Sequence, residues 1–97
     1  MKDIRFSWDE RKAAQNARKH GVSFEEAMTV FFDENATEFF DPDHSADEDR
    51  FLMLGVSSRL RLLVVHYAVR ENGTQIRIIS ARKPTKDECK SYTREEP

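Results

Sequence analysis

Basic side chains gather on one face of a β-hairpin that the sequence predicts between Arg61 and Lys83. Two runs of alternating apolar residues flank Asn72-Gly73, a pair typical of a tight hairpin turn because both of its residues adopt positive φ. A two-residue loop sets the pairing of the strands, and side chains then alternate between the two faces along each strand. In this register the polar face carries four potential cations: Arg70, Arg77, His66 and Lys83. Arginine donates paired hydrogen bonds and stays charged, so this face is suited to hold a phosphate.

The same register predicts which hairpin residues lie away from that polar face. It pairs His66 with Ile79, and it directs Ser80 and Arg82 to the opposite face unless a β-bulge intervenes. That opposite face is otherwise apolar and should lie in the core: Leu63, Val65, Tyr67, Val69, Ile76 and Ile78. Arginines at the rim of a sheet also cover apolar surface with their stems, so the phosphate interpretation depends on the cluster and not on any single arginine.

Cleavage of RNA by attack of a 2′-OH on the neighbouring phosphate is one reaction that such a face can serve. The reaction needs a base, cations that stabilise the phosphorane, and an acid that protonates the leaving oxygen. His20, next to Lys19, has the pKa range for proton transfer near neutral pH, although a histidine at the end of a helix also acts as a C-terminal cap. His66, in the middle of a predicted strand, is more typical of a packed core histidine.

Charge is strongly segregated along the chain, although the net charge is only −2. Residues 33–49 contain eight acids and no lysine or arginine, whereas residues 50–83 contain seven lysines and arginines and one acid. The basic block creates a local positive field that favours an anionic partner. An alternative is that the two blocks neutralise each other as neighbouring strands. Within the acidic block, a divalent metal could be held by Asp41, Asp43, His44, Asp47 and Glu48, but their spacing is not that of an EF-hand, and a solvated loop is favoured.

Length and composition bound the remaining possibilities. The 97 residues are 38% hydrophobic and 35% charged, which predicts one globular domain over 1–97. The single cysteine, Cys89, fits a reducing compartment, and no run approaches the roughly 20 apolar residues of a membrane span. Because the first residues lack the apolar stretch of a signal peptide, we expect a cytoplasmic protein.

The elements that position these residues are predicted from periodicity and capping signals. Asp9 is a good N-cap for a helix that ends near His20, where Gly21 supplies a left-handed stop. Ser23 and Glu26 form a capping box for a second helix. Strands are predicted at Ile4–Trp8 (a strand or an extended arm), Thr37–Phe40, Arg50–Val56 and the two arms of the hairpin, followed by a short helix from Lys86 to about Arg94. The predicted fold is an α+β domain with an antiparallel four-stranded meander, two N-terminal helices on one face and a short C-terminal helix.

Several strings of residues resemble the BrnT family of toxins of type II toxin–antitoxin systems, in the family's order and over roughly residues 5–92. They are Phe6-Ser7-Trp8-Asp9, Lys19-His20-Gly21-Val22-Ser23-Phe24-Glu25-Glu26-Ala27, His44-Ser45 with Glu48-Asp49-Arg50, and Ile76-Arg77-Ile78-Ile79-Ser80-Ala81-Arg82-Lys83. The resemblance implies a RelE-like fold and a ribonuclease that needs no metal or other cofactor. Such an enzyme cleaves mRNA by internal transesterification and inhibits translation.

The resemblance also implies a partner. A BrnA-like antitoxin would neutralise the toxin, and the ribbon-helix-helix portion of this antitoxin would bind operator DNA. The toxin itself would therefore meet DNA only through the antitoxin. The implied complex is a heterotetramer with two antitoxins.

The motif positions of the family correspond here to Lys19, His20, His44, Glu48, Arg50, Arg77, Ser80 and Arg82. Together with the hairpin register, the resemblance leads us to expect Arg77, His20 and Lys19 as catalytic residues, and Arg70, Lys83, Arg82, Ser80 and Arg50 as RNA contacts. Two alternatives stay open. A non-catalytic module that binds the antitoxin as a co-repressor would fit the acidic net charge, and a metal-dependent phosphodiesterase would use the three loop residues Asp41, Asp43 and His44.

Overall fold

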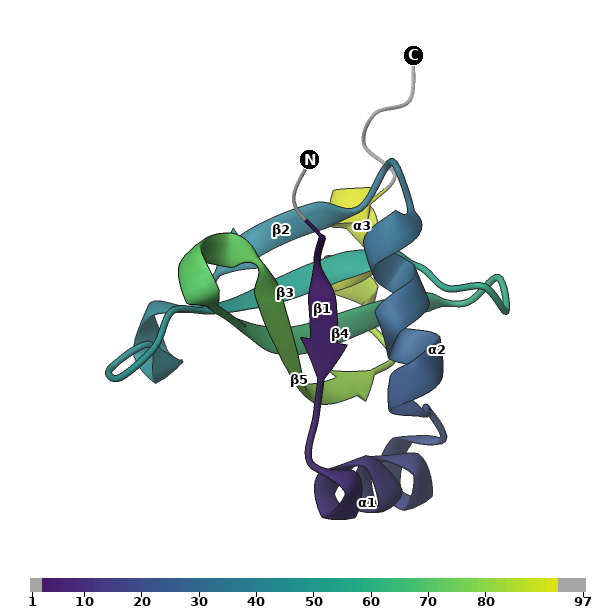
Figure 1. The fold of residues 1–97 in the computed structure, drawn as a ribbon. Coiled ribbons are helices and arrows are strands. Elements are labelled where there is room, and N and C mark those ends of the chain that lie inside the picture. Colours follow the sequence, from purple (N-terminus) through teal and green to yellow (C-terminus); the bar gives the residue numbers. More distant parts are fainter. Residues whose placement is uncertain (1–2, 93–97) are drawn as a thin grey trace.

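The computed structural model describes residues 3–92, which form a five-stranded sheet with helices beside it (Figure 1). The strands are β1 (Arg5–Ser7), β2 (Thr37–Phe40), β3 (Arg50–Val56), β4 (Leu62–Arg70) and β5 (Gln75–Arg82). The helices are α1 (Glu10–His20), α2 (Phe24–Thr29) and α3 (Lys86–Tyr92), and the short 3-10 turns are η1 (Val30–Phe32), η2 (Pro42–His44) and η3 (Glu71–Gly73). The predicted α+β class is therefore confirmed.

The sheet contains one strand more than the predicted meander. Its order is β1-β5-β4-β3-β2, and β2 to β5 form an antiparallel meander as expected. β1 adds to the outer edge of β5 in the parallel direction, with Arg5 opposite Gln75 and Ser7 opposite Arg77. The prediction of a purely antiparallel four-stranded sheet is wrong at this edge. Parallel pairing needs a long crossover connection, and the local spacing of residues does not reveal which strand such a connection will reach.

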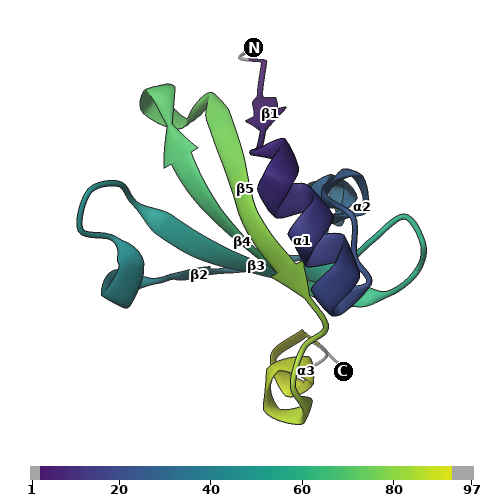
Figure 2. The same ribbon diagram turned by 90° about the horizontal axis from the view of Figure 1, so that it is seen from below.

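α1 also departs from the predicted arrangement, in which both N-terminal helices lie on one face of the sheet. α2 covers that face, where Phe24 belongs to the same buried cluster as Leu63. α1 instead lies beside β5 (Figure 2). The buried residue of α1 is Asn16, whose amide donates to the carbonyl of Ala81 at 2.9 Å and accepts from the N–H of Ala81 at 3.1 Å. An asparagine side chain thus serves as hydrogen-bonding neighbour for the second half of β5, beyond the half that pairs with β1.

Capping residues set the ends of the two N-terminal helices as predicted. The carboxylate of Asp9 accepts two backbone N–H bonds, at 2.8 and 3.1 Å, and Gly21 ends α1 with a φ of 70°. Ser23 Oγ accepts the N–H of Glu26 at 3.0 Å. The reciprocal half of the predicted capping box does not form, because the Glu26 carboxylate turns to Arg61, whose Nε donates to it at 2.9 Å.

A β-bulge at Ile79 changes which side chains share a face. Near the turn, β4 and β5 pair as predicted, with Ala68 opposite Arg77. Farther along, the register shifts by one residue, and His66 lies opposite Ser80 instead of Ile79. The predicted pairing is therefore wrong beyond this point. Because a shift of one residue exchanges the faces of a strand, Ser80 turns to the face that carries Arg77 and His66.

The same shift moves Arg82 to the face of Arg77, opposite Val64, and buries Ala81 in the core cluster on the other face. β5 ends at Arg82, so the exposed Lys83 lies beyond the strand. The predicted grouping of Lys83 with Arg70, Arg77 and His66 on one strand face is therefore not observed.

α3 lies on the face of the sheet opposite to α2 (Figures 1 and 2). A pocket of about 320 Å³ between α3 and the sheet is lined by Phe39, Leu52, Leu54, Val64, Glu88 and Ser91. The helix begins with reciprocal hydrogen bonds, in which the N–H of Thr85 donates to Glu88 Oε1 at 2.8 Å and the N–H of Glu88 donates to Thr85 Oγ1 at 3.1 Å. The predicted helix is confirmed as far as Tyr92, and its predicted end near Arg94 lies outside the described residues. Within residues 3–92, no helix has the length and apolar character needed to cross a membrane.

Candidate functional site

Glu48 lies at the centre of three arginines on the face of the sheet opposite to α2. Its carboxylate accepts hydrogen bonds from Arg50 Nη2 at 3.0 Å and from Arg70 Nε at 2.9 Å, and a further one from Arg77 Nη2. The strand register explains the grouping, because Arg50, Ala68 and Arg77 lie side by side on β3, β4 and β5. The small side chain of Ala68 leaves room for the carboxylate between the two arginines. We call these four charged residues, Glu48 with its three arginines, the arginine cluster.

The arginine cluster carries more positive than negative charge. Burial alone would raise the pKa of Glu48, but hydrogen bonds from Arg70 and Arg50 and the charge of Arg77 outweigh it and hold the pKa below its usual value. Glu48 is therefore ionised at neutral pH, and one carboxylate faces three guanidinium groups. Arg77 Nε is buried and has no hydrogen-bond partner among the described residues. A phosphate oxygen would provide the acceptor and the negative charge that this cluster lacks.

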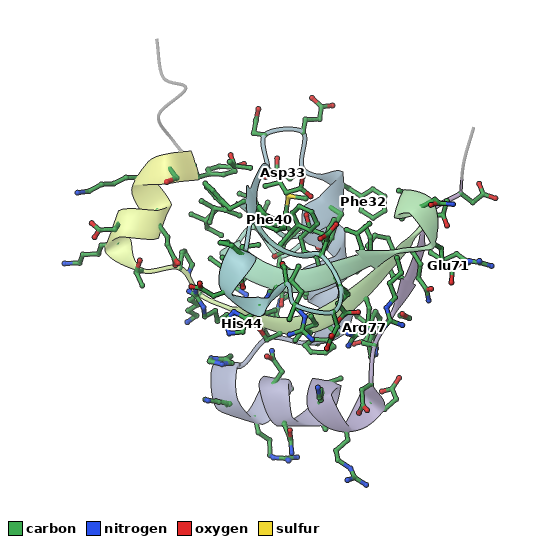
Figure 3. The ribbon with its side chains drawn as sticks, turned by 90° about the vertical axis from the view of Figure 1, so that its left-hand side faces the viewer. Phe32, Asp33, Phe40, His44, Glu71 and Arg77 are labelled. Carbon is green, nitrogen blue, oxygen red and sulfur yellow. The ribbon has the colours of Figure 1, made fainter. Side chains whose placement is uncertain are left out.

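Two histidines meet one carboxylate beside the arginine cluster. Asp41 Oδ2 lies 2.9 Å from His44 Nδ1 and 3.1 Å from His66 Nε2. Burial lowers the pKa of His66, and this effect outweighs the opposing charge of Asp41. The charge of Arg50 also lowers the pKa of His66, so this histidine group and the arginine cluster share one electrostatic environment. Figure 3 shows His44 and Arg77 on the side of the sheet that lies above α1 in that view.

The end of α1 and the bulged part of β5 enclose a cleft of about 310 Å³, lined by Lys12, Gln15, Asn16, Lys19, His20, Ile79 and Ser80. The side chains of Lys19 and His20 form no hydrogen bond or ion pair with residues 3–92. Asn16 fixes α1 in this place, since its amide also donates to the carbonyl of Val22 at 2.9 Å. Because Ser80 lies opposite His66 in the sheet, the cleft adjoins the histidine group.

The structure therefore brings most of the predicted site residues to one region. Arg77, Arg70 and Arg50 form the arginine cluster, and Lys19, His20 and Ser80 line the neighbouring cleft. Two of the predicted RNA contacts lie apart from both groups. Arg82 donates to Glu88 of α3 at 2.8 and 3.0 Å, which raises the pKa of Arg82, and the exposed Lys83 lies beyond β5.

Sequence reasoning named Glu48 as a motif position and correctly placed His66 on the polar face, but it did not predict that Glu48 binds the arginines or that Asp41 lies against His66. The signal for Glu48 was its position two residues before Arg50, at the start of a strand whose neighbours also carry arginines. Asp41 stands directly before Pro42, and a proline at this place indicates that β2 ends in a tight turn. Both residues belong to the acidic block, so the predicted alternative of mutual neutralisation is realised at Glu48 while an excess of positive charge remains.

Comparisons with known proteins identify the family of the chain and show a related fold. A family model described as "Ribonuclease toxin, BrnT, of type II toxin-antitoxin system" matches residues 8–88. The crystal structure of the ribonuclease toxin BrnT from Brucella abortus superposes with a TM-score of 0.63 over 86% of this chain and 99% of that chain, at 24% sequence identity. At this identity the likeness shows the shared fold. No curated protein matches the chain. Since the family model spans most of the sequence, the chain belongs to the BrnT family of ribonuclease toxins of type II toxin–antitoxin systems.

Proposed function

We propose that this chain is an mRNA endonuclease that cleaves RNA by internal transesterification without a metal ion and thereby inhibits translation in the cytoplasm. The observation that carries the proposal is an ionised carboxylate, Glu48, held among three arginines. A carboxylate can accept the proton of a ribose 2′-OH, and guanidinium groups can stabilise the charge that develops on the phosphorane.

In the proposed reaction, Glu48 takes the proton from the 2′-OH as the 2′ oxygen attacks phosphorus. Arg77 stabilises the crowded phosphorane, with Arg70 and Arg50 beside it. The bond from phosphorus to the 5′ oxygen breaks, which leaves a 2′,3′-cyclic phosphate on one product. The other product needs a proton on its departing 5′ oxygen.

His20 is the proposed donor of that proton. It lines the cleft with Ser80, and it has no carboxylate partner among residues 3–92. Lys19, its neighbour in the cleft, would bind the phosphate of an adjoining nucleotide. His66 is less suited to the role of acid, because burial lowers its pKa and leaves it uncharged at neutral pH.

Cleavage of a defined RNA by the purified protein in EDTA tests this proposal. We expect cyclic-phosphate products from the wild type and a slower reaction with Arg77→Ala, by about 2–4 kcal/mol in the barrier. Arg59→Ala is the matched control, because Arg59 is exposed in the turn between β3 and β4. Cleavage that requires an added metal ion, or equal rates for wild type and Arg77→Ala, would count against the mechanism.

A family of type II toxins implies an antitoxin. We propose a BrnA-like protein with a ribbon-helix-helix portion, bound as a heterotetramer of two toxins and two antitoxins, so that operator DNA is reached only through the antitoxin. Relief of toxicity by co-expression, together with a mass for the purified complex that fits two copies of each chain, would support this. A complex of one toxin and one antitoxin, with half of that mass, would contradict the heterotetramer.

The second candidate is a non-catalytic co-repressor that only binds the antitoxin. One observation favours it: the arginines of the cluster are already held by Glu48, and Arg82 is held by Glu88. Under this alternative the purified protein leaves RNA intact but tightens the binding of the antitoxin to operator DNA.

A further inference from the structure

Three potential metal ligands meet from two separate segments of the chain. Asp41 and His44 come from the turn around η2, whereas His66 comes from the middle of β4. One ligand atom from each residue lies within 4.8 Å of the other two. Both imidazole nitrogens lie close to the same oxygen, Asp41 Oδ2, at 2.9 and 3.1 Å.

The turn that carries two of these ligands is fixed to the sheet by its backbone. The N–H of Asp41 donates to the carbonyl of Arg50 at 2.9 Å. Ser45 Oγ donates to the carbonyl of Asp41 at 2.6 Å and accepts the N–H of Arg50 at 3.0 Å. The backbone that carries Asp41 and His44 is therefore fixed before any ion binds, which reduces the ordering that binding would require.

His66 Nε2 is the second observation that points to a ligand. This nitrogen is buried and makes no well-aligned hydrogen bond, although Asp41 lies near it. A buried polar atom without a hydrogen bond is uncommon and calls for an explanation.

Two imidazoles and one carboxylate form a donor set that suits zinc and related divalent transition metals. Tetrahedral zinc with ligands at about 2.0–2.2 Å separates neighbouring ligand atoms by roughly 3.3–3.5 Å. The two nitrogen–oxygen distances here are 2.9 and 3.1 Å and need to widen by only a few tenths of an ångström, whereas the two nitrogens, which lie within 4.8 Å of each other, need to move closer together. His44 is mostly exposed, with 61% of its side chain accessible, and can make this adjustment.

We propose that Asp41, His44 and His66 bind one divalent transition-metal ion, zinc by its donor chemistry, with an open fourth position toward solvent. The ion ties the turn at η2 to β4. Because the loop after this turn carries Glu48, metal binding steadies the loop that completes the arginine cluster. The ion takes no part in the cleavage reaction proposed above.

Titration of the tag-free wild-type protein with Zn²⁺ tests the site without any RNA, so the outcome does not depend on the proposed ribonuclease activity. Calorimetry should give one ion per chain, and Zn²⁺ should raise the melting temperature in a way that EDTA reverses. Co²⁺ should produce the visible absorption of a tetrahedral site. His44→Gln and Asp41→Asn should weaken binding at least about tenfold, and the exposure of His44 makes its variant the safer one to fold.

His20→Gln is the matched control, because His20 is the one histidine outside the group. Cys89→Ser controls for binding at the single thiol. Both variants should bind Zn²⁺ as the wild type does. The proposal is overturned if the wild type fails to bind Zn²⁺ or Co²⁺, if His44→Gln binds with unchanged affinity, or if either control variant loses binding. In any of these cases, the three residues only lie close together and do not form a metal site.

Discussion

Replacing Glu48 by glutamine separates two roles that its carboxylate could have in the arginine cluster. The carboxylate either removes a proton during the reaction or only neutralises the arginines around it. Glu48→Gln keeps the shape of the side chain and one oxygen acceptor but removes the negative charge. The side chain is mostly covered, with 13% accessible, so the amide should remain among the same arginines.

The structure sets the expected cost in stability. A hydrogen bond to a charged group contributes about 1.5–3 kcal/mol, and an exposed ion pair only about 0.2–1 kcal/mol. Arg70 is half exposed at 51%, whereas Arg50 and Arg77 are largely covered, at 29% and 26%. With one acceptor oxygen retained, we expect the free energy of unfolding at pH 7 to fall by about 2–3 kcal/mol.

The pH dependence of this loss follows from the lowered pKa of Glu48. A carboxyl group whose pKa is lower in the folded than in the unfolded protein stabilises the fold fully above its unfolded value, here 4.5, and loses that contribution as the pH falls through the folded value. Urea denaturation of wild type and Glu48→Gln should therefore differ most at neutral pH. The two should converge in acid.

Activity distinguishes the two roles. Loss of a general base should slow cleavage by a factor on the order of 10²–10⁴, whereas removal of one negative charge should leave RNA binding equal or tighter. Asp47→Asn makes the same charge change in the same loop at an exposed residue without an ion pair among residues 3–92, and it should cleave as the wild type does. If folded Glu48→Gln cleaves as fast as Asp47→Asn, Glu48 is no base and only holds the arginines in place.

Three further substitutions test how the site is supported. Asn16→Leu removes three buried side-chain hydrogen bonds to backbone groups, and we expect urea denaturation to show a loss of about 3–5 kcal/mol, together with slower cleavage as α1 detaches from β5. Hydrogen bonds from Arg82 lower the pKa of Glu88 to about 2 from 4.5, so the contribution of this pair is complete above pH 4.5 and is lost as the pH falls toward 2. Glu88→Gln should flatten the stability curve in that range and speed alkylation of Cys89 at pH 7, whereas unchanged alkylation would mean that this pair does not hold α3. A Cβ at Gly55 would lie 2.9 Å from two side-chain carbons, so Gly55→Ala should cost about 1–3 kcal/mol in chemical denaturation.

The sequence predicted most element boundaries because local interactions decide them. Asp9 and Gly21 cap α1 through bonds within a few residues, and the bounds of β2 and β3 agree with the alternation and the flanking breakers. Asn72 and Gly73 have the predicted positive φ values, but Glu71 shares this conformation and the strands end at Arg70 and Gln75, so the connection is longer than the predicted two residues. The pairing of β1 with β5 was not predicted, because no local pattern tells which distant strand a short N-terminal segment will reach.

The composition of the site was harder to predict than its location. Arg77 and Arg70 were correctly placed on one polar face, since the register near the turn is regular. The partner of these arginines comes from a loop, and Glu48 is one of eight acids in residues 33–49. Sequence spacing does not tell which acid of a flexible segment will meet a given arginine. The acidic and basic blocks therefore predicted, as one alternative, that they neutralise each other, but not that a single carboxylate would bind three arginines.

The bulge at Ile79 lets β5 bury an apolar residue in the core and still place its polar residues on the face of the candidate site. With regular pairing, Ser80 and Arg82 would point toward the helix α2, and a charged side chain there would enter the apolar core at a large cost in desolvation. The extra residue instead buries Ala81, which is 0% exposed, and returns both polar side chains to the face of Arg77. The apolar residues around Ile79 are compatible with a regular strand and with a bulge. Only packing against α2 therefore selects the bulged register. The joining of the arginine cluster to the cleft of α1 is thus a consequence of core packing, and the geometry of the candidate site depends on the same side chains that hold the sheet to its helix.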